Sequence, residues 1–467
     1  MRRSVSTWSA PVAGLAAAFL APTTLDAQPH ALQVNDAGDV TGCTCGTDHF
    51  GGTTASSDGV VASPFRYFGD PFDRWFNNSN AAGFTGVQGD PITLTYGIVP
   101  DGTTINGTGV VGENTALTSN LVQFLNTNVG SQALWTSLID DAYQRWGELS
   151  GLTMVREIND DGAAMGSPGA GGVNGVRADM RIGGRFLDGQ SGSNVLAYNY
   201  SPNNGDHVVD TSNTGFYSNA TNNYRGFRNV FMHEAGHGLG FAHHESANSQ
   251  GLMEPFISTS FDGPQHDDIL AVQRNYGDAL EANGGNNSFS NATALGSLDP
   301  VALTDPVSEL RIGSDASDLT NFVAADATDF VSIDGTSDRD AYAFTLTADG
   351  DVTLQLDPRG PTYLESVQDG TQTPLNTKAL ADLALSLLDS AGNAIASGNL
   401  FGAGFGETIN MALAAGDYFA VVRTQAGSAD NVQLYELAIS AVVIPEPGTV
   451  MVLLSGAGLT LLRRRAA

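Results

Sequence analysis

Residues 233–243 read His233-Glu234-Ala235-Gly236-His237-Gly238-Leu239-Gly240-Phe241-Ala242-His243. Residues four positions apart share one face of a helix, so His233 and His237 can offer two imidazoles to one metal ion. Gly240 lets the chain turn out of the helix, which brings His243 back as a third metal ligand. Three neutral nitrogens with one open position are the arrangement of a catalytic zinc site. Glu234 lies beside these ligands, where it can accept a proton from an activated water as general base.

A second pattern follows this motif. Ten residues after His243 stands Met253, in Gly251-Leu252-Met253-Glu254-Pro255-Phe256, and a helical segment reads Asp267-Asp268-Ile269-Leu270-Ala271-Val272-Gln273-Arg274-Asn275-Tyr276-Gly277. Residues from about 90 to 277 resemble the metzincins and, within them, the matrixin-like proteases. The resemblance implies zinc-dependent cleavage of peptide bonds by the residues quoted above, with Met253 as the Met-turn residue beneath the metal.

Hydrophobic periodicity around these motifs indicates an α+β domain. Strands are predicted at residues 92–99, 178–183 and 194–200, and helices at about 131–150, 224–240 and 267–276. We therefore expect a metzincin-like α+β catalytic domain over residues 64–280.

The resemblance also suggests roles for residues around the zinc. Strand 194–200 should be the edge strand above the metal, where Leu196, Ala197 and Tyr198 would pair with an extended peptide. Tyr198 stands where matrixins usually carry a zinc-ligating histidine, so a second, structural zinc is not expected. Four carboxylates near family calcium positions are either ligands of a structural Ca²⁺ or simple turn and surface groups: Asp179, Asp188, Asp206 and Asp210.

Both ends of the chain read as sorting signals. Residues 1–27 combine two arginines, a short apolar run and a small-residue cleavage site, which is typical of a secretory signal peptide. Residues 442–467 contain Pro445-Glu446-Pro447, an apolar stretch and three arginines, and resemble a PEP-CTERM sorting signal; a plain membrane anchor is the alternative. The resemblance implies an exosortase-type partner, transient membrane contact through the tail, and export to the bacterial cell surface, the extracellular matrix or the medium.

The leader, residues 28–63, is polar and can serve as a propeptide. It contains Cys43 and Cys45. In matrixins a leader thiolate can block the zinc, but the residues around these cysteines do not match the known switch sequence. A redox-active or surface-exposed thiol pair is therefore favoured.

Downstream of the catalytic region the pattern changes. Residues 281–297 have no apolar face and read as a linker, whereas short alternating strands separated by Gly and Asp turns fill residues 298–441. The pattern predicts an all-β sandwich, which resembles the bacterial pre-peptidase C-terminal domain over about residues 330–441. Substrate or matrix binding, folding support and a spacer role are all open for this domain.

Charge restricts the classes of partner. The chain has 50 acidic and 20 basic residues, for a formal net charge of −30, which argues against nucleic-acid binding. Such acidity suits either calcium binding or solubility after export. We expect an exported zinc endopeptidase that acts on protein or peptide substrates. The alternative is a catalytically inactive surface or matrix adhesion protein on a metzincin scaffold, which would have no need of an intact Glu234.

Overall fold

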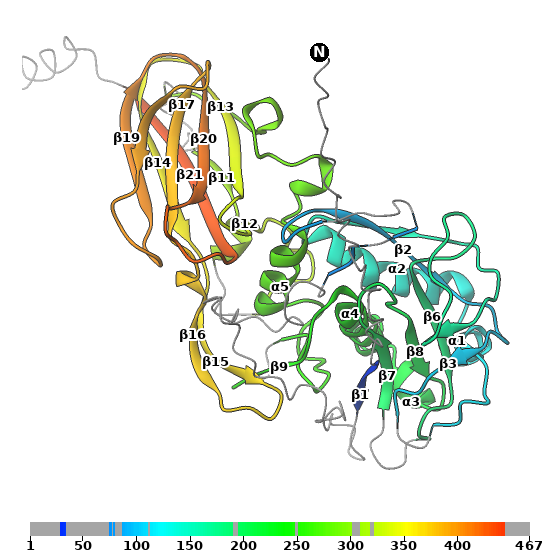
Figure 1. Cartoon of the computed structure of the whole chain (residues 1–467). Coiled ribbons are helices and arrows are strands. Elements are labelled where there is room, and N and C mark those ends of the chain that lie inside the picture. Colours follow the sequence, from blue (N-terminus) through cyan, green and yellow to red (C-terminus); the bar gives the residue numbers. More distant parts are fainter. Residues whose placement is uncertain are drawn as a thin grey trace, which may run out of the picture.

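The computed structural model describes residues 29–33, 74–76, 78–79, 86–110, 113–189, 195–247, 251–300, 309–317 and 322–443. These residues form an α+β domain and a β-rich domain (Figure 1). The predicted signal peptide, both leader cysteines and nearly all of the predicted sorting tail lie outside the described residues. Within the described ranges, no helix is long and apolar enough to cross a membrane.

A six-stranded sheet is the frame of the α+β domain, in the order β1-β7-β8-β6-β2-β4. The strands are β1 (Pro29–Gln33), β2 (Ile92–Ile98), β4 (Leu152–Arg156), β6 (Met180–Arg185), β7 (Val195–Tyr200) and β8 (His207–Asp210). β2 is parallel to β4 and β6, and β6 is parallel to β8, whereas β7 is antiparallel to both of its neighbours. Two short strands, β3 (Ile105–Asn106) and β5 (Met165–Gly166), pair with each other outside this sheet. The three strands predicted in this domain are confirmed to within two residues.

Helices accompany this sheet. They are α1 (Leu121–Asn128), α2 (Gln132–Glu148), α3 (Thr214–Tyr217), α4 (Arg225–Leu239) and α5 (His266–Tyr276). The Ser131 hydroxyl caps α2 by accepting a hydrogen bond from the backbone N–H of Leu134. α2 packs against α4, and the buried indole of Trp146 donates to the Met232 carbonyl at 3.0 Å. The predicted helices at 131–150, 224–240 and 267–276 are therefore confirmed.

One strand does not lie where the sequence predicts. Strand 194–200 is expected at the edge of the sheet, but β7 lies between β8 and β1. β1 comes from the leader and pairs antiparallel with β7, with Ala31 opposite Tyr198 and Leu32 opposite Ala197. An exposed strand edge offers unpaired N–H and C=O groups, and the leader satisfies them here. The prediction of a free edge is therefore wrong for the chain with its leader attached.

The second domain consists of two sheets, in the orders β10-β13-β20-β17-β18 and β11-β21-β14-β19, with β12 also paired to β21. Their bounds are β10 (Thr293–Leu298), β11 (Glu309–Ile312), β12 (Val331–Ile333), β13 (Arg339–Leu346), β14 (Gly350–Pro358), β17 (Leu383–Asp389), β18 (Ala394–Gly398), β19 (Glu407–Leu413), β20 (Gly416–Thr424) and β21 (Gln433–Val443). Side chains from both sheets share one buried core, including Phe344 and Val422 from the first and Leu354 and Leu437 from the second. The sandwich is confirmed, but β10 lies inside the predicted linker and pairs with β13, so the sandwich begins at Thr293.

A hairpin connects the two domains. β15 (Thr362–Val367) and β16 (Thr373–Asn376) extend away from the sandwich, and β15 pairs with β9 (His244–Ser246) of the α+β domain (Figure 1). Figure 1 shows this hairpin reaching down beside α5 and α4. The sheet that it forms with β9 therefore belongs to both domains.

An apolar cluster adds to this connection. Leu149 and Leu270 of the α+β domain are buried together with Phe330 and Leu434 of the sandwich. The side-chain amide of Gln273 lies between them and donates to the Leu149 carbonyl at 2.9 Å and to the Phe330 carbonyl at 3.1 Å. The domains consequently meet in a packed interface next to α5.

Candidate metal centre

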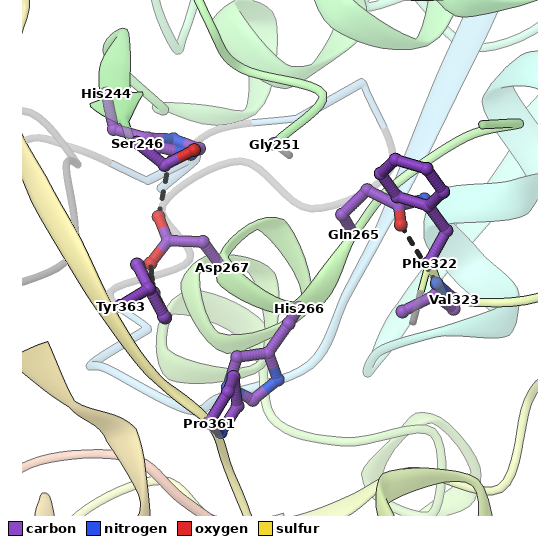
Figure 2. A pocket seen from close by; sticks show the side chains of 10 residues that line it. All are labelled: His244, Ser246, Gly251, Gln265, His266, Asp267, Phe322, Val323, Pro361 and Tyr363. Atoms are coloured by element: carbon purple, nitrogen blue, oxygen red, sulfur yellow. Dashed lines mark hydrogen bonds and ion pairs between the residues drawn. The ribbon is translucent and has the colours of Figure 1, made fainter. Parts of the chain in front are cut away.

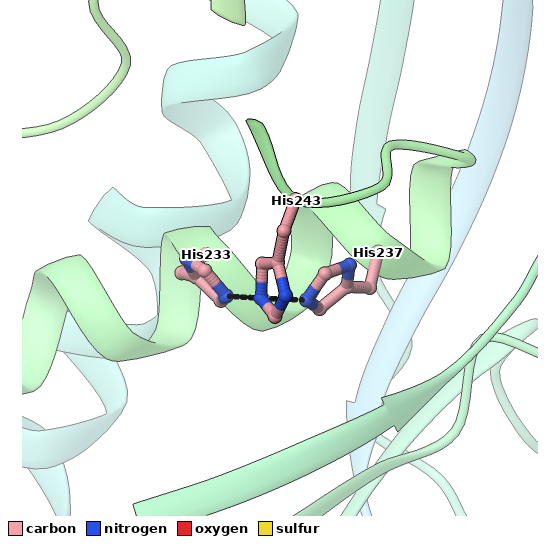
Figure 3. Close-up of side chains that lie close together, drawn as sticks. All are labelled: His233, His237 and His243. Carbon is pink, nitrogen blue, oxygen red and sulfur yellow. Dashed lines mark hydrogen bonds between the residues drawn. The ribbon is translucent and has the colours of Figure 1, made fainter. Parts of the chain in front are cut away.

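Helix α4 and the turn after it bring three imidazoles together. The helix ends at Gly240, whose φ of 106° is left-handed and is readily adopted only by glycine. The turn directs His243 back toward His233 and His237 (Figure 3). The Nε2 atom of His243 lies 3.1 Å from the Nε2 atoms of both helical histidines. All three side chains are buried, and their nitrogens are grouped closely enough to hold one metal ion.

The outer nitrogen of each ring has an oxygen partner. The Nδ1 atom of His233 lies 2.7 Å from the Leu252 carbonyl, and that of His237 lies 2.7 Å from the Phe241 carbonyl. The third ring makes the same kind of contact, at 3.0 Å, with the side-chain oxygen of Gln368. Because an oxygen of this kind only accepts, each Nδ1 carries the proton and each Nε2 presents a lone pair.

These lone pairs fit a zinc ion. Two unprotonated nitrogens 3.1 Å apart attract each other only through a shared proton or cation. Tetrahedral zinc with Zn–N bonds of 2.0–2.1 Å would separate its nitrogens by about 3.3 Å. The observed spacing and the neutral imidazole donors therefore match a zinc site with three protein ligands.

Glu234 is fully buried on the same helical turn as His233. Burial raises the pKa of Tyr143 well above its usual range, and the negative charge of Glu234 raises it further. The same two causes act on the pKa of Tyr217, where Asp210 also contributes. Glu234 thus lies inside a largely desolvated pocket, next to the three converging histidines.

Met253 lies directly beneath the helix that carries two of the ligands. A Cβ atom built on Gly236 would lie 2.4 Å from the Met253 sulfur, so this glycine allows the close approach. The backbone N–H groups of Leu252 and Met253 donate to the Asp268 carboxylate at 2.7 and 3.0 Å. Asp268 on α5 thereby holds the turn that contacts α4, in the place expected for a Met-turn.

The predicted substrate-binding residues could contact a peptide only through their main chain, whose outer edge is paired with β1 here. The side chains of Leu196, Ala197 and Tyr198 are buried. The Tyr198 hydroxyl donates to Glu113 at 3.2 Å, and the same carboxylate pairs with Arg185 at 2.6 Å. Tyr198 is therefore hydrogen-bonded to one member of a buried ion pair. At this position matrixins carry a zinc-ligating histidine.

The four aspartates with predicted calcium roles do not form one cluster. Asp179 accepts hydrogen bonds from Thr95 N and Oγ1, Asp188 from Val195 N, Asp206 from Gly166 N and Arg181 N, and Asp210 from Leu187 N and Ser212 N. Burial raises the pKa of Asp206 to about 7 and that of Asp210 to about 6. None of the four belongs to a group of potential metal ligands among the described residues. Their hydrogen bonds instead fix loops to the sheet.

Sequence reasoning missed a second group of potential ligands. Asp278, Glu281 and Asp340 are buried, and each offers an oxygen that lies within 4.8 Å of the other two. Apart from the neighbouring carboxyl group of Asp278, no hydrogen-bond donor among the described residues reaches either oxygen of Glu281 or the Oδ1 atom of Asp340. The side chain of Asn286, also buried, has neither its nitrogen nor its oxygen paired. The acid-rich Ser337-Asp338-Arg339-Asp340 segment was the available signal, but its partners lie at the end of the predicted catalytic domain and in the predicted linker.

A small cavity lies between the domains near β9. Its volume is about 40 Å³, and its lining includes His244, His266, Asp267 and Tyr363 (Figure 2). The Tyr363 hydroxyl donates to the Asp267 carboxylate, which also lies 3.3 Å from the His244 ring. Burial lowers the pKa of His266 to about 4, so this ring is neutral at pH 7. The cavity is too small for a peptide side chain of ordinary size, and its polar walls connect α5 with β15.

Comparisons with known proteins agree with this geometry for the α+β domain. A comparison with curated proteins found no match. The pre-peptidase C-terminal domain of a Bacillus anthracis collagenase is 13% identical, with a TM-score of 0.19, over 32% of this chain and 96% of the other. The Aeromonas hydrophila lysozyme inhibitor PliG is 14% identical, with a TM-score of 0.17, over 32% and 98%. Likenesses at this level carry no argument about the sandwich.

Residues 113–277 match the family model described as Matrixin, a peptidase family. The match includes the three converging histidines, Glu234 and Met253. This part of the chain is therefore similar to the matrixins, which supports a zinc metallopeptidase.

Proposed function

We propose that the chain is an exported zinc-dependent endopeptidase in which Glu234 is the general base. The observation that carries this proposal is the convergence of three Nε2 atoms, with contacts of 3.1 Å, inside the matrixin-like region. When bound, zinc acidifies a water molecule and polarises a carbonyl group. Buried beside the ligands, Glu234 would hold the proton taken from that water and pass it to the leaving amine. Because the pocket excludes solvent, the proton on Glu234 would not be lost to bulk water before it reaches the leaving amine.

The proposed substrate is an extended segment of a protein or peptide. Pairing with β7 would position the scissile bond through main-chain hydrogen bonds, since the β7 side chains are buried. The proposal also includes export of the chain and its release or retention at the cell surface. It further includes an exosortase-type partner and transient membrane contact. All of these rest on the two terminal sequence patterns. An adhesion protein without turnover is the competing proposal.

Removal of the metal tests the function. Chelation should lower cleavage of an unfolded protein substrate by at least about 100-fold, because the metal supplies several kcal/mol of transition-state stabilisation. One equivalent of Zn²⁺ should restore it. Bound zinc and cleavage would be measured on the same sample of the whole chain. Cleavage that resists chelation would refute the zinc mechanism, and stoichiometric zinc without cleavage would favour the adhesion protein.

The leader should reduce activity while β1 occupies the edge of β7. A tethered strand has an effective concentration in the millimolar range, which a micromolar substrate cannot match. Proline at both Ala31 and Leu32 removes neighbouring N–H groups and should prevent pairing. We expect kcat/KM to rise about 10- to 100-fold in the whole chain. The same double substitution at Asp36 and Ala37, outside β1, is the control; an equal rise in both variants, or in neither, would contradict the prediction.

We further propose that calcium binds at Asp278, Glu281 and Asp340 rather than at the four aspartates predicted from sequence. The buried Glu281 carboxyl and Asp340 Oδ1, which no N–H or hydroxyl group among the described residues reaches, and the unpaired Asn286 side chain support this location. Hard oxygen donors are the ligands that Ca²⁺ prefers. Burial raises the pKa of Asp278 to about 7, and that of neighbouring Asp334 to about 9, where the charge of Asp338 adds to the shift. A divalent cation would neutralise this group.

A further inference from the structure

The third histidine differs from the other two in the origin of its partner. His233 and His237 donate to backbone carbonyls within the α+β domain. His243 donates instead to the side-chain oxygen of Gln368, 125 residues away in the β-rich domain. This histidine lies on the turn after α4 and is not carried by the helix itself. The orientation of its ring therefore depends on a contact from the second domain.

Strand pairing explains why Gln368 lies at this position. β9 begins immediately after His243, and β15 ends immediately before Gln368. The antiparallel register places His244 opposite Val367. One more step along the same ladder brings His243 and Gln368 side by side. Their contact is thus a consequence of the register of the interdomain sheet.

The hairpin is also fixed to the α+β domain at positions distant from its tip. The Tyr363 hydroxyl donates to Asp267 of α5, and the His266 ring lies 2.9 Å from the Thr377 hydroxyl. The backbone N–H of Ala247 donates to the Leu364 carbonyl at 3.1 Å. These contacts fix β15 against the same helix whose Asp268 supports the Met-turn. The amide of Gln368 is consequently presented by a strand with several anchors.

We propose that Gln368 is a positioning residue of the zinc centre and that the β-rich domain completes this centre. The amide oxygen keeps the proton of His243 on Nδ1 and directs Nε2 toward the metal position. Partners of this kind typically change metal affinity or activity by about 10- to 100-fold when they are removed. This inference rests on the proposed function, but it assigns the sandwich a role that a spacer would not have.

Two substitutions at Gln368 distinguish its effect on the orientation of the His243 ring from its effect on side-chain packing. Gln368→Met keeps the length of the side chain but removes the amide oxygen, and Gln368→Glu restores an accepting oxygen. Thr371→Ala, at an exposed site of the same hairpin, is the matched control. The zinc dissociation constant would be measured in the whole chain by competition with a chelator. The melting temperature of the zinc-free protein and the visible spectrum with Co²⁺ would be recorded beside it.

We expect Gln368→Met to weaken zinc binding about 10- to 100-fold and to alter the Co²⁺ spectrum, with an unchanged zinc-free melting temperature. Gln368→Glu and Thr371→Ala should remain within about threefold of the wild type, below the range expected for a lost partner. Zinc affinity of Gln368→Met equal to that of the wild type would overturn the inference. So would a loss matched by a lower zinc-free melting temperature and not rescued by Gln368→Glu. A wild-type chain that binds no zinc would refute the proposed function itself.

Discussion

Glu234→Gln should lower kcat by about 10²- to 10⁴-fold while the chain keeps its zinc. The amide has nearly the shape of the carboxylate, so the buried pocket remains filled. It cannot accept the proton, however, and the carboxylate is the group that we assign to proton transfer. Since the three metal ligands are histidines, the stoichiometry of bound zinc should be unaffected. Zinc content and single-turnover cleavage of an unfolded protein substrate provide the two measurements.

Two further variants sharpen this result. Glu234→Asp keeps the charge but withdraws it by one methylene group, so we expect activity between those of the wild type and Glu234→Gln. Glu148→Gln makes the same chemical change at the exposed end of α2 and should leave kcat unchanged. Full activity in Glu234→Gln would remove the assigned role from this residue, whatever the zinc content.

The convergence of the three histidines could be predicted because their geometry is local. His233 and His237 are one helical turn apart, and Gly240 alone allows the left-handed step that returns His243. The predicted helices followed from the same short-range periodicity. Resemblance was needed for Met253, since a buried methionine has no local signature, and the structure places it against Gly236.

The remaining features depend on contacts between distant segments. Gln368 reaches His243 only through the register of β9 and β15, which no local pattern encodes. The leader strand has no recognisable pattern within the polar leader, because five residues are too few to show a period. The acidic group could not be recognised because neither the segment with Asp278 and Glu281 nor β13 alone contains enough carboxylates for a site. Predictions from sequence therefore succeeded for elements with a local pattern and failed for contacts between the two domains or with the leader.

Calcium should raise the melting temperature of the β-rich domain by about 5–10 °C at pH 8. Saturation to 100 times the dissociation constant contributes about 2.7 kcal/mol, and each kcal/mol shifts the melting temperature by a few degrees in a domain of this size. The physical reason is the buried group of Asp278, Glu281 and Asp340, in which carboxylates lie without enough positive charge or donors. Calorimetry of the whole chain, with Ca²⁺ or with chelator plus added zinc, measures the shift.

Without calcium, the melting temperature should fall as the pH rises, which is the opposite of ordinary acid denaturation. Burial raises the pKa values of Asp278, Asp334 and Asp338 to about 7, 9 and 6, above the value near 3.9 expected for the unfolded chain. The folded state therefore binds more protons, and this stabilisation is complete below pH 4 and is lost progressively as pH rises from about 4 to about 9. In chelator the melting temperature should fall over that window, whereas Ca²⁺ should oppose the fall because it favours the charged carboxylates.

Glu281→Gln distinguishes a cation site from general acidity. Burial and the neighbouring carboxylates raise the pKa of Glu281 far above its usual range, so this group is protonated in chelator, and the substitution removes the charge that it would carry when a cation binds. It should stabilise the protein in chelator at pH 8 and abolish most of the calcium response. Asp351→Asn, at an exposed site on β14, removes the same charge and should preserve that response. An equal response to Ca²⁺ in both variants would place the ion elsewhere. The calcium response is the decisive measurement because the pH dependence alone is ambiguous. Raised pKa values at Asp206, Asp210 and Asp268 give the same sign of pH dependence, and Glu281→Gln would not change them.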